Sequence, residues 1–311
     1  MNARIAAFAT LRSRPQLHDP APRSRPASRG PAAALLARPL MDPKLQRRAQ
    51  RHGWDLAARD YESLWQAQLA PARRALLAAA QPAAGERVLD VACGTGPVTF
   101  EAARTTGSAG WVLGTDLSAH MVRTGRQSAA RRGVTNVGFE RMDAERLMLA
   151  DGAFEVALCS LGLMYVPDPA RALAEMRRVL RPGGRVALSV WGGRERCGWA
   201  GVFPVVQAEV ASEVCPHFFR LGEPARLLEL CRAAGLRDVR EERVAATLIY
   251  EDDRQASAAA LSDGPVALVC SRLDAQQQAR IRGRYLRSIE PWRYGEGYRI
   301  PVEFVIVHAR S

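Results

Sequence analysis

Residues 88–97 read Val-Leu-Asp-Val-Ala-Cys-Gly-Thr-Gly-Pro. An apolar run that enters two glycines and a proline predicts a buried strand, a tight turn and the first residue of a helix. Gly94 and Gly96 carry no side chain, so a ligand can approach the backbone of the turn closely. The turn therefore predicts a cofactor site, although glycine also serves strand-to-helix turns for structural reasons alone.

Short apolar runs and helical patterns alternate regularly around this turn. Such alternation predicts an α/β fold with a parallel sheet covered on both faces. The expected strands are residues 87–92, 110–115, 136–140, 154–159 and 185–191. The expected helices are residues 97–104, 118–132 and 169–180, and Arg181-Pro182-Gly183-Gly184 predicts a helix stop and a tight turn.

The sequence divides into three parts. Residues 1–40, rich in Arg, Pro, Ala and Ser, are predicted to be disordered. They are alternatively a transit-like leader, or lie upstream of a true start at Met41. Residues 41–84 form an N-terminal segment of one or two helices, and residues 85–311 form the main domain. Within that domain we expect helical insertions at about 193–222 and 251–291, a helix at 224–234, and strands at 239–250 and 298–308.

The net charge of +12 lies mostly at the front of the chain. Residues 1–51 hold eleven basic and two acidic side chains, so the other 260 residues carry 33 basic and 30 acidic ones. That balance argues against a nucleic-acid-binding face on the folded body. The six cysteines have no zinc-binding spacing, so no metal is expected. Charges interrupt every apolar run within about 18 residues, which predicts a cytoplasmic protein without a membrane span.

Two acidic residues follow later expected strands. Asp116 ends the second strand, where a carboxylate can accept hydrogen bonds from both hydroxyls of a ribose. A dinucleotide-binding turn would carry a third glycine at position 99, but that residue is Thr99, which disfavours pyrophosphate binding. Asp143 follows the third strand and is placed to accept from an adenine amino group, to cap a helix, or to do both.

The ordered set VLDVACGTGPVT, GTDLSAHMV, RMDAERL, FEVALCSLGLMYVPDP and RVLRPGGRVALSVW resembles the motif series of class I S-adenosylmethionine-dependent methyltransferases. It is most similar to the small-molecule and quinone-biosynthesis group, over about residues 85–192. The resemblance implies a Rossmann-like sheet of seven strands with the last antiparallel. It also implies S-adenosylmethionine as the cofactor, lying across the carboxyl ends of the first, second and fourth strands.

The resemblance also assigns roles to individual residues. Asp90 and the backbone of Gly94 and Gly96 would hold the methionine part of the cofactor. Asp116 would bind the ribose, and the backbone around Ser160 and Leu161 would lie beside the amino group. The remaining assignments are Met121 against the adenosine, Asp143 and the Ala144 backbone at the adenine, and Tyr61 near the methionine end or the sulfonium.

The acceptor is less well specified. Ser160-Leu161-Gly162-Leu163 replaces the (N/D)PP(Y/F) box of amino-directed DNA methyltransferases, which disfavours methylation of bases. His217 is a weak candidate for a general base, since a histidine beside two phenylalanines more often packs structurally. Asp168 is expected to cap the following helix. Two stretches are expected either to cover the acceptor pocket or only to complete the core. They are the helix at residues 54–69 and the segment after Trp191, which includes residues 199–219 and the helices between 250 and 291.

The sequence thus predicts methyl transfer to a small, largely apolar acceptor such as a phenol, a quinol or a natural-product ring. Two alternatives stay open at this point: a nicotinamide-dependent oxidoreductase on a related sheet, and a non-catalytic cofactor-binding paralogue. The motifs specify neither the methylated atom nor the oligomeric state.

Overall fold

The computed structural model describes residues 42–210 and 218–311. The expectations for residues 1–40, and the candidate base His217, lie outside these ranges. Within them, no helix is long and apolar enough to cross a membrane.

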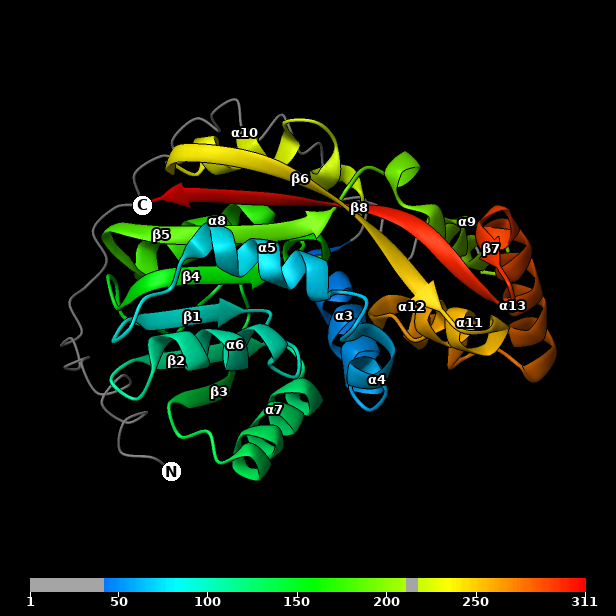
Figure 1. The fold of residues 1–311 in the computed structure, drawn as a ribbon, viewed down its shortest axis with the longest axis horizontal. Helices are drawn as coiled ribbons and strands as arrows, with labels where there is room; N and C mark the ends of the chain where they lie inside the picture. The colour runs from blue at the N-terminus through cyan, green and yellow to red at the C-terminus, as the bar shows by residue number, and fades with distance from the viewer. Residues whose placement is uncertain (1–41, 211–217) are drawn as a thin grey trace, which may run out of the picture.

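An eight-stranded sheet with strand order β3-β2-β1-β4-β5-β8-β6 forms the centre of the molecule (Figure 1). β8 is antiparallel to both of its long neighbours, which confirms the expected reversed last strand. A two-residue strand, β7 (Arg293–Tyr294), pairs with β8 and brings the expected seven strands to eight. The other strands are β1 (Arg87–Val91), β2 (Trp111–Asp116), β3 (Val137–Arg141), β4 (Phe154–Ser160), β5 (Leu180–Trp191), β6 (Arg237–Tyr250) and β8 (Gly297–Arg310).

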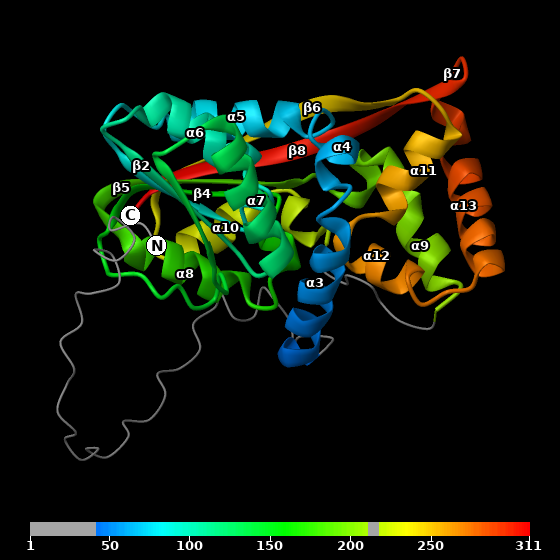
Figure 2. The same cartoon turned by 90° about the horizontal axis from the view of Figure 1, so that it is seen from below.

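Helices cover both faces of the sheet, as the alternating pattern predicts. α5 (Ala70–Ala80) and α6 (Pro97–Thr106) lie on one face, with α8 (Pro169–Val179) and α10 (Arg226–Ala233) on the other (Figure 2). α7 (Ala119–Arg132) packs against β2 and β3. Alternate strand residues enter two separate cores: Val88, Val112 and Val156 on the α5 and α6 side, and Leu89, Ala157 and Val186 on the other.

The expected turn at residues 181–184 is instead an irregular part of β5. β4 pairs Phe154 with Leu180 and then Val156 with Arg185, so the four intervening residues bulge from the strand. Gly183 adopts a φ of +74°, which a residue without a Cβ tolerates. The expectation of a sharp break here was therefore half right: the helix ends at Val179, but strand pairing resumes at once.

A cap of short helices lies beyond the carboxyl end of β5. β8 pairs with β5 as far as Phe304, whereas its pairing with β6 continues to Tyr298, so β6 and β8 project past the sheet and support the cap (Figure 1). The N-terminal segment contributes three helices rather than one or two. The cap consists of α3 (Pro43–Ala57), α4 (Tyr61–Trp65), α9 (Val202–Gln207), α11 (Asp253–Leu261), α12 (Gly264–Cys270) and α13 (Ala275–Ile289). Single 3-10 turns are η1 (Leu163–Tyr165), η2 (Arg194–Arg196), η3 (Gly198–Gly201), η4 (Arg220–Gly222) and η5 (Glu290–Trp292).

α3 and α12 meet backbone to backbone at two glycines. A Cβ on Gly53 would lie 2.3 Å from the carbonyl oxygen of Gly264, and a Cβ on Gly264 would lie 2.6 Å from the Trp54 ring. The absence of side chains at both positions therefore sets how closely the N-terminal helix approaches the rest of the cap.

We expect Gly53→Ala to destabilise the protein by about 1–3 kcal/mol, because the added methyl group overpacks this contact. Gly283→Ala is the matched control in α13, where a Cβ would meet the flexible end of Arg287 at 3.6 Å. That replacement should be neutral or stabilise by up to about 1 kcal/mol, since alanine is the better helix former. Thermal unfolding measures both, and an unchanged Tm for Gly53→Ala would contradict the close contact.

Candidate active site

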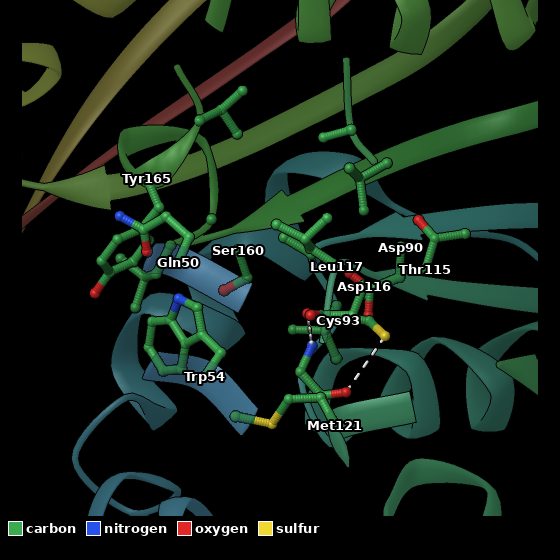
Figure 3. Close-up of a pocket in the computed structure, with 18 of the residues that line it drawn as sticks. Gln50, Trp54, Asp90, Cys93, Thr115, Asp116, Leu117, Met121, Ser160 and Tyr165 are labelled. Carbon is green, nitrogen blue, oxygen red and sulfur yellow. Dashed lines mark hydrogen bonds between the residues drawn. The ribbon is translucent and has the colours of Figure 1, made fainter. Parts of the chain in front are cut away.

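A cavity opens at the carboxyl ends of β1, β2 and β4 beneath α3 and α4 (Figure 3). Its empty space is about 1090 Å³ with its open mouth included. All but one of the cofactor residues expected from the sequence line this cavity, and they come from five separate segments. They are Tyr61, Asp90, Gly94, Asp116, Met121, Asp143, Ala144 and Ser160.

Gly96 is the exception. It adopts a φ of +98° at the start of α6, and a Cβ there would lie 2.6 Å from the Phe139 ring. Gly96 does not line the cavity, and its missing Cβ makes room for the Phe139 ring; its backbone contact with the cofactor stays a prediction.

Asp116 joins the turn after β1 to the end of β2. One of its carboxylate oxygens accepts a hydrogen bond from the Gly94 amide at 2.9 Å, and the other accepts from the Ser118 amide at 2.8 Å. Burial raises the pKa of Asp116 to about 6, against the opposing effect of these two backbone donors. A carboxylate offers about four lone-pair positions, so two backbone bonds leave Asp116 able to accept from ligand hydroxyls.

Asp90 is a buried carboxyl with an incomplete set of partners. Its Oδ2 accepts a hydrogen bond from the Thr99 hydroxyl at 2.7 Å, whereas its Oδ1 has no hydrogen-bond partner among the described residues. Burial raises the pKa of Asp90 to about 7. An unpaired buried carboxylate is costly, so its position on the cavity wall fits a cationic ligand group such as an ammonium. Thr99 stands where a dinucleotide-binding turn would carry a glycine, and in this structure its hydroxyl orients Asp90.

The turns after β1 and β4 hold a strained backbone that the sequence did not reveal. Ala92 and Leu161 have φ angles of +56° and +54° although neither is glycine. Such residues cost on the order of 1–3 kcal/mol each and cluster at ligand sites. A Cβ on Gly162 would lie 2.4 Å from the Ala92 Cβ, so the two turns can meet because residue 162 is glycine.

Asp143 caps no helix, because none begins there. Its Oδ1 accepts from the Glu145 amide at 2.9 Å, and its Oδ2 pairs with Arg47 Nε of α3 at 3.1 Å. Arg47 also hydrogen-bonds to the buried carboxylate of Glu145. Sequence reasoning missed this pairing of the N-terminal helix with the loop after β3, since nothing local links residues so far apart.

Aromatic rings and a second arginine complete the wall. Trp54 lies edge-on to Tyr61 at 5.8 Å and to Tyr165 at 5.0 Å between ring centroids. Burial raises the pKa of Tyr61, the carboxylates of Asp263 and Asp116 add to the rise, and Arg73 opposes it. Arg73 lines the cavity from α5 and donates to Glu101 at 2.5 Å.

Comparison with known proteins identifies the family. Residues 82–218 match the family described as "Methyltransferase domain". Aklanonic acid methyltransferase DauC of Streptomyces sp. (strain C5) is 34% identical over 156 residues, which span 50% of this chain and 69% of that protein. The ubiquinone/menaquinone biosynthesis C-methyltransferase UbiE of Bdellovibrio bacteriovorus is 43% identical over 109 residues, 35% of this chain and 46% of the relative.

The chain belongs to the class I S-adenosylmethionine-dependent methyltransferases. The phosphoethanolamine N-methyltransferase 2 of Haemonchus contortus, solved with phosphomonomethylethanolamine and S-adenosylhomocysteine, shares the fold of this methyltransferase. The two superpose with a TM-score of 0.53 to 0.54 in two ligand states, and the match with the S-adenosylhomocysteine complex is 17% identical over 83% of this chain and 57% of that one.

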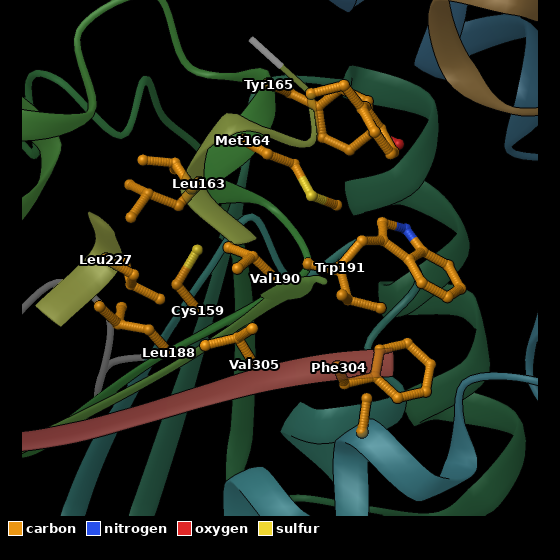
Figure 4. Close-up of a cluster of buried hydrophobic side chains, with 14 of the residues drawn as sticks. Cys159, Leu163, Met164, Tyr165, Leu188, Val190, Trp191, Leu227, Phe304 and Val305 are labelled. Carbon is orange, nitrogen blue, oxygen red and sulfur yellow. The ribbon is translucent and has the colours of Figure 1, made fainter. Parts of the chain in front are cut away.

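The expected acceptor-pocket aromatics pack elsewhere in the methyltransferase. Trp199, Phe203 and Phe218 are almost fully buried and stack on one another, with Trp191 next to Trp199. Figure 4 shows Trp191 above Phe304 of β8 in this core. None of these side chains lines the cavity, so the alternative that they complete the core is the correct one for them. Asp168 accepts from the Arg171 amide at 3.0 Å, which confirms its helix-capping role.

We expect the affinity for S-adenosylhomocysteine to fall as the pH drops through about 7, where Asp90 gains a proton in the ligand-free protein. The sign follows from charge: only the ionised carboxylate attracts the ligand's ammonium, so binding must expel the proton at low pH. Protonation of Asp116 weakens binding further below about pH 6.

Asp90→Asn should remove the fall in affinity near pH 7. It should also weaken binding at alkaline pH by about 1.5–3 kcal/mol, the usual range for a charged hydrogen bond. Titration calorimetry across this pH range measures both effects. Asp151→Asn, at an exposed carboxylate, is the control and should behave as the wild type. A variant at position 90 that keeps the wild-type pH dependence would remove Asp90 from the binding site.

Proposed function

We propose that this methyltransferase binds S-adenosylmethionine in the cavity and transfers its methyl group to a small, largely apolar hydroxyl-bearing ring, such as a phenol, a quinol or a natural-product ring. The observation that carries the proposal is that buried Asp90, whose Oδ1 has no hydrogen-bond partner among the described residues, lines a cavity that ends in aromatic rings. The names of the aklanonic acid and ubiquinone/menaquinone methyltransferases support an acceptor of this class.

We propose that residues on every wall of the cavity bind the cofactor. Asp90 and the backbone of Gly94 bind the methionine part, and Asp116 binds the ribose hydroxyls. The backbone at Ser160 lies beside the amino group. At the other end, Met121 packs on the adenosine, while Asp143 and the Ala144 backbone bind the adenine edge.

The bound cofactor supplies a methyl group that is already activated on a sulfonium. The protein must therefore align the acceptor with that group and exclude water, tasks that supply about 7–11 kcal/mol in well-oriented reactions. α3 suits these tasks because its Trp54 lines the cavity. The Asp55 carboxylate of the same helix accepts a hydrogen bond from the Ser118 hydroxyl at 2.6 Å, which fixes the helix to the start of α7.

Binding and product formation test the proposal in sequence. At a hundredfold excess over its Kd, S-adenosylhomocysteine should stabilise the protein by about 2.7 kcal/mol, whereas NADH should leave the Tm unchanged. Labelled S-adenosylmethionine is then incubated with a panel of phenols, quinols and amines. We expect product from phenols or quinols; stabilisation without any product would support the non-catalytic alternative, and stabilisation by NADH would support the oxidoreductase.

Arg73, which sequence analysis missed, is proposed to bind the carboxylate of the cofactor's methionine part. It lies on the same side of the cavity as Tyr61, whose ring would be 3.8 Å from a Cβ on Gly94. Arg73→Gln should weaken the binding of S-adenosylhomocysteine by about 1.5–3 kcal/mol. It should leave the binding of 5′-methylthioadenosine unchanged, because that ligand has no carboxylate. Arg74→Gln, at the exposed neighbouring arginine of α5, is the matched control. Equal losses for both ligands would contradict the assignment.

A further inference from the structure

Asp263 stands at the N-cap position of α12 but does not cap that helix. Its side chain makes no hydrogen bond to an amide of the first turn. An aspartate at this position normally makes that bond. Four other N-cap aspartates of the described residues make it, namely Asp42, Asp168, Asp252 and Asp274, whereas Asp60 before the short helix α4 does not. The carboxyl of Asp263 is therefore directed elsewhere, at the expense of its own helix.

The Tyr165 hydroxyl is the partner of this carboxyl. It donates to the two oxygens of Asp263 at 3.0 and 3.1 Å across 98 residues of sequence. Asp263 is 6% exposed, and its burial raises its pKa to about 7, with the Tyr165 hydrogen bond as the opposing effect. The pair is thus a buried carboxyl joined to a single phenol.

Tyr165 connects this carboxyl with the cavity. Its ring belongs to the cavity wall, edge-on to Trp54. Figure 3 shows Tyr165 and Trp54 at the end of the pocket away from Asp116 and Met121, with Ser160 between the two ends. Because Asp116 and Met121 mark the nucleoside end in the proposed function, the Tyr165 end is where the methyl acceptor would lie.

We propose that Tyr165 and Asp263 form a relay that takes the proton from the hydroxyl group of the methyl acceptor. This inference rests on the proposed function. The acceptor O–H proton moves to the Tyr165 oxygen while the Tyr165 proton moves to the Asp263 carboxylate. The acceptor oxygen forms the new bond to the methyl carbon, the carbon–sulfur bond breaks with its electron pair kept by sulfur, and Asp263 later releases its proton to water.

This relay selects a substrate class. A carboxylate acceptor has no proton to give up at neutral pH, whereas a phenol or an enol does. The rings of Tyr165 and Trp54, which both line the cavity, suit a flat ring that carries such a hydroxyl. The pair therefore favours O-methylation of a phenol or enol.

Few charged groups surround the relay. Tyr61 on α4 is close enough for the charge of Asp263 to raise its pKa. Asp116 also raises the pKa of Tyr61, and Arg73 lowers it. α3 and α11 pack against α12 with Gly53, Trp54 and small residues of α11 such as Ala260. The titration of Asp263 is therefore expected to depend mainly on its burial and on Tyr165.

The kinetic test uses the best phenol of the panel with S-adenosylmethionine. In the wild type, kcat should rise with pH and level off above about 7, because the relay needs Asp263 ionised. Asp263→Asn and Tyr165→Phe should each lower kcat by about a hundredfold or more and lose that pH limb. Both should bind S-adenosylhomocysteine with unchanged Kd, which shows that they fold. Wild-type kcat and pH profile in both variants would overturn the relay.

A spectroscopic test needs no turnover. 4-Nitrophenol, whose phenolate absorbs visible light, is titrated into the protein saturated with S-adenosylhomocysteine at a pH below the probe's own pKa. The bound probe should be more ionised than free probe in the wild type, and no more ionised than free probe in Asp263→Asn or Tyr165→Phe. Bound probe with equal ionisation in all three proteins, or no binding to the wild type, would overturn the relay for phenols.

Tyr285→Phe is the matched control for both tests. Its hydroxyl is buried in α13 without a hydrogen-bond partner among the described residues, so the variant removes a buried phenol oxygen away from the cavity. It should keep the wild-type kcat, pH profile and probe spectrum. A wild type that fails to bind S-adenosylhomocysteine would refute the proposed function itself, a result distinct from any failure of the relay.

Discussion

The hydrogen bond from the Gly94 amide to the Asp116 carboxylate determines the shape of the cofactor edge. It ties the turn after β1 to the end of β2, 22 residues further on. The other carboxylate oxygen binds the Ser118 amide immediately before α7. One side chain thus positions the starts of two helices, and the positive φ of Gly94 allows its amide to reach that carboxylate. The residues that this carboxylate joins line the wall of the cavity, so its hydrogen bonds help to set the shape of that wall.

The parts of the site that follow a strand could be read from the sequence. Asp90, Asp116 and Asp143 each stand at or just after a strand, and the carboxyl ends of parallel strands meet at one edge. Their convergence in the cavity follows from the alternation of strands and helices alone. Gly96 is harder to interpret, because a glycine needed for packing against Phe139 looks the same in sequence as one that makes room for a ligand.

The contacts between distant segments could not be read in this way. Arg47 meets Glu145, and Tyr165 meets Asp263, each across 98 residues. No periodicity links such partners, because the packing of α3 and α12 brings them together. The aromatic residues of the cap show the same limit. Residues such as Trp199 and Phe218 are typical both of apolar ligand pockets and of buried cores, and only the fold shows which of the two they form.

Asp90 and Asp263 lie in similar environments. Each carboxyl is buried, each accepts from one hydroxyl, and burial raises the pKa of each to about 7. Hydrogen bonds from Thr99 to Asp90 and from Tyr165 to Asp263 do not offset the effect of burial on either pKa, so each group responds to charge introduced nearby. For Asp90 that charge is a ligand's ammonium, which would keep the carboxylate ionised. For Asp263 it is a proton delivered through Tyr165, which the carboxylate can accept because its pKa is already close to neutral pH. Two similar buried carboxyls thus suit different tasks because Asp90 lines the cavity itself, whereas Asp263 is joined to it through Tyr165.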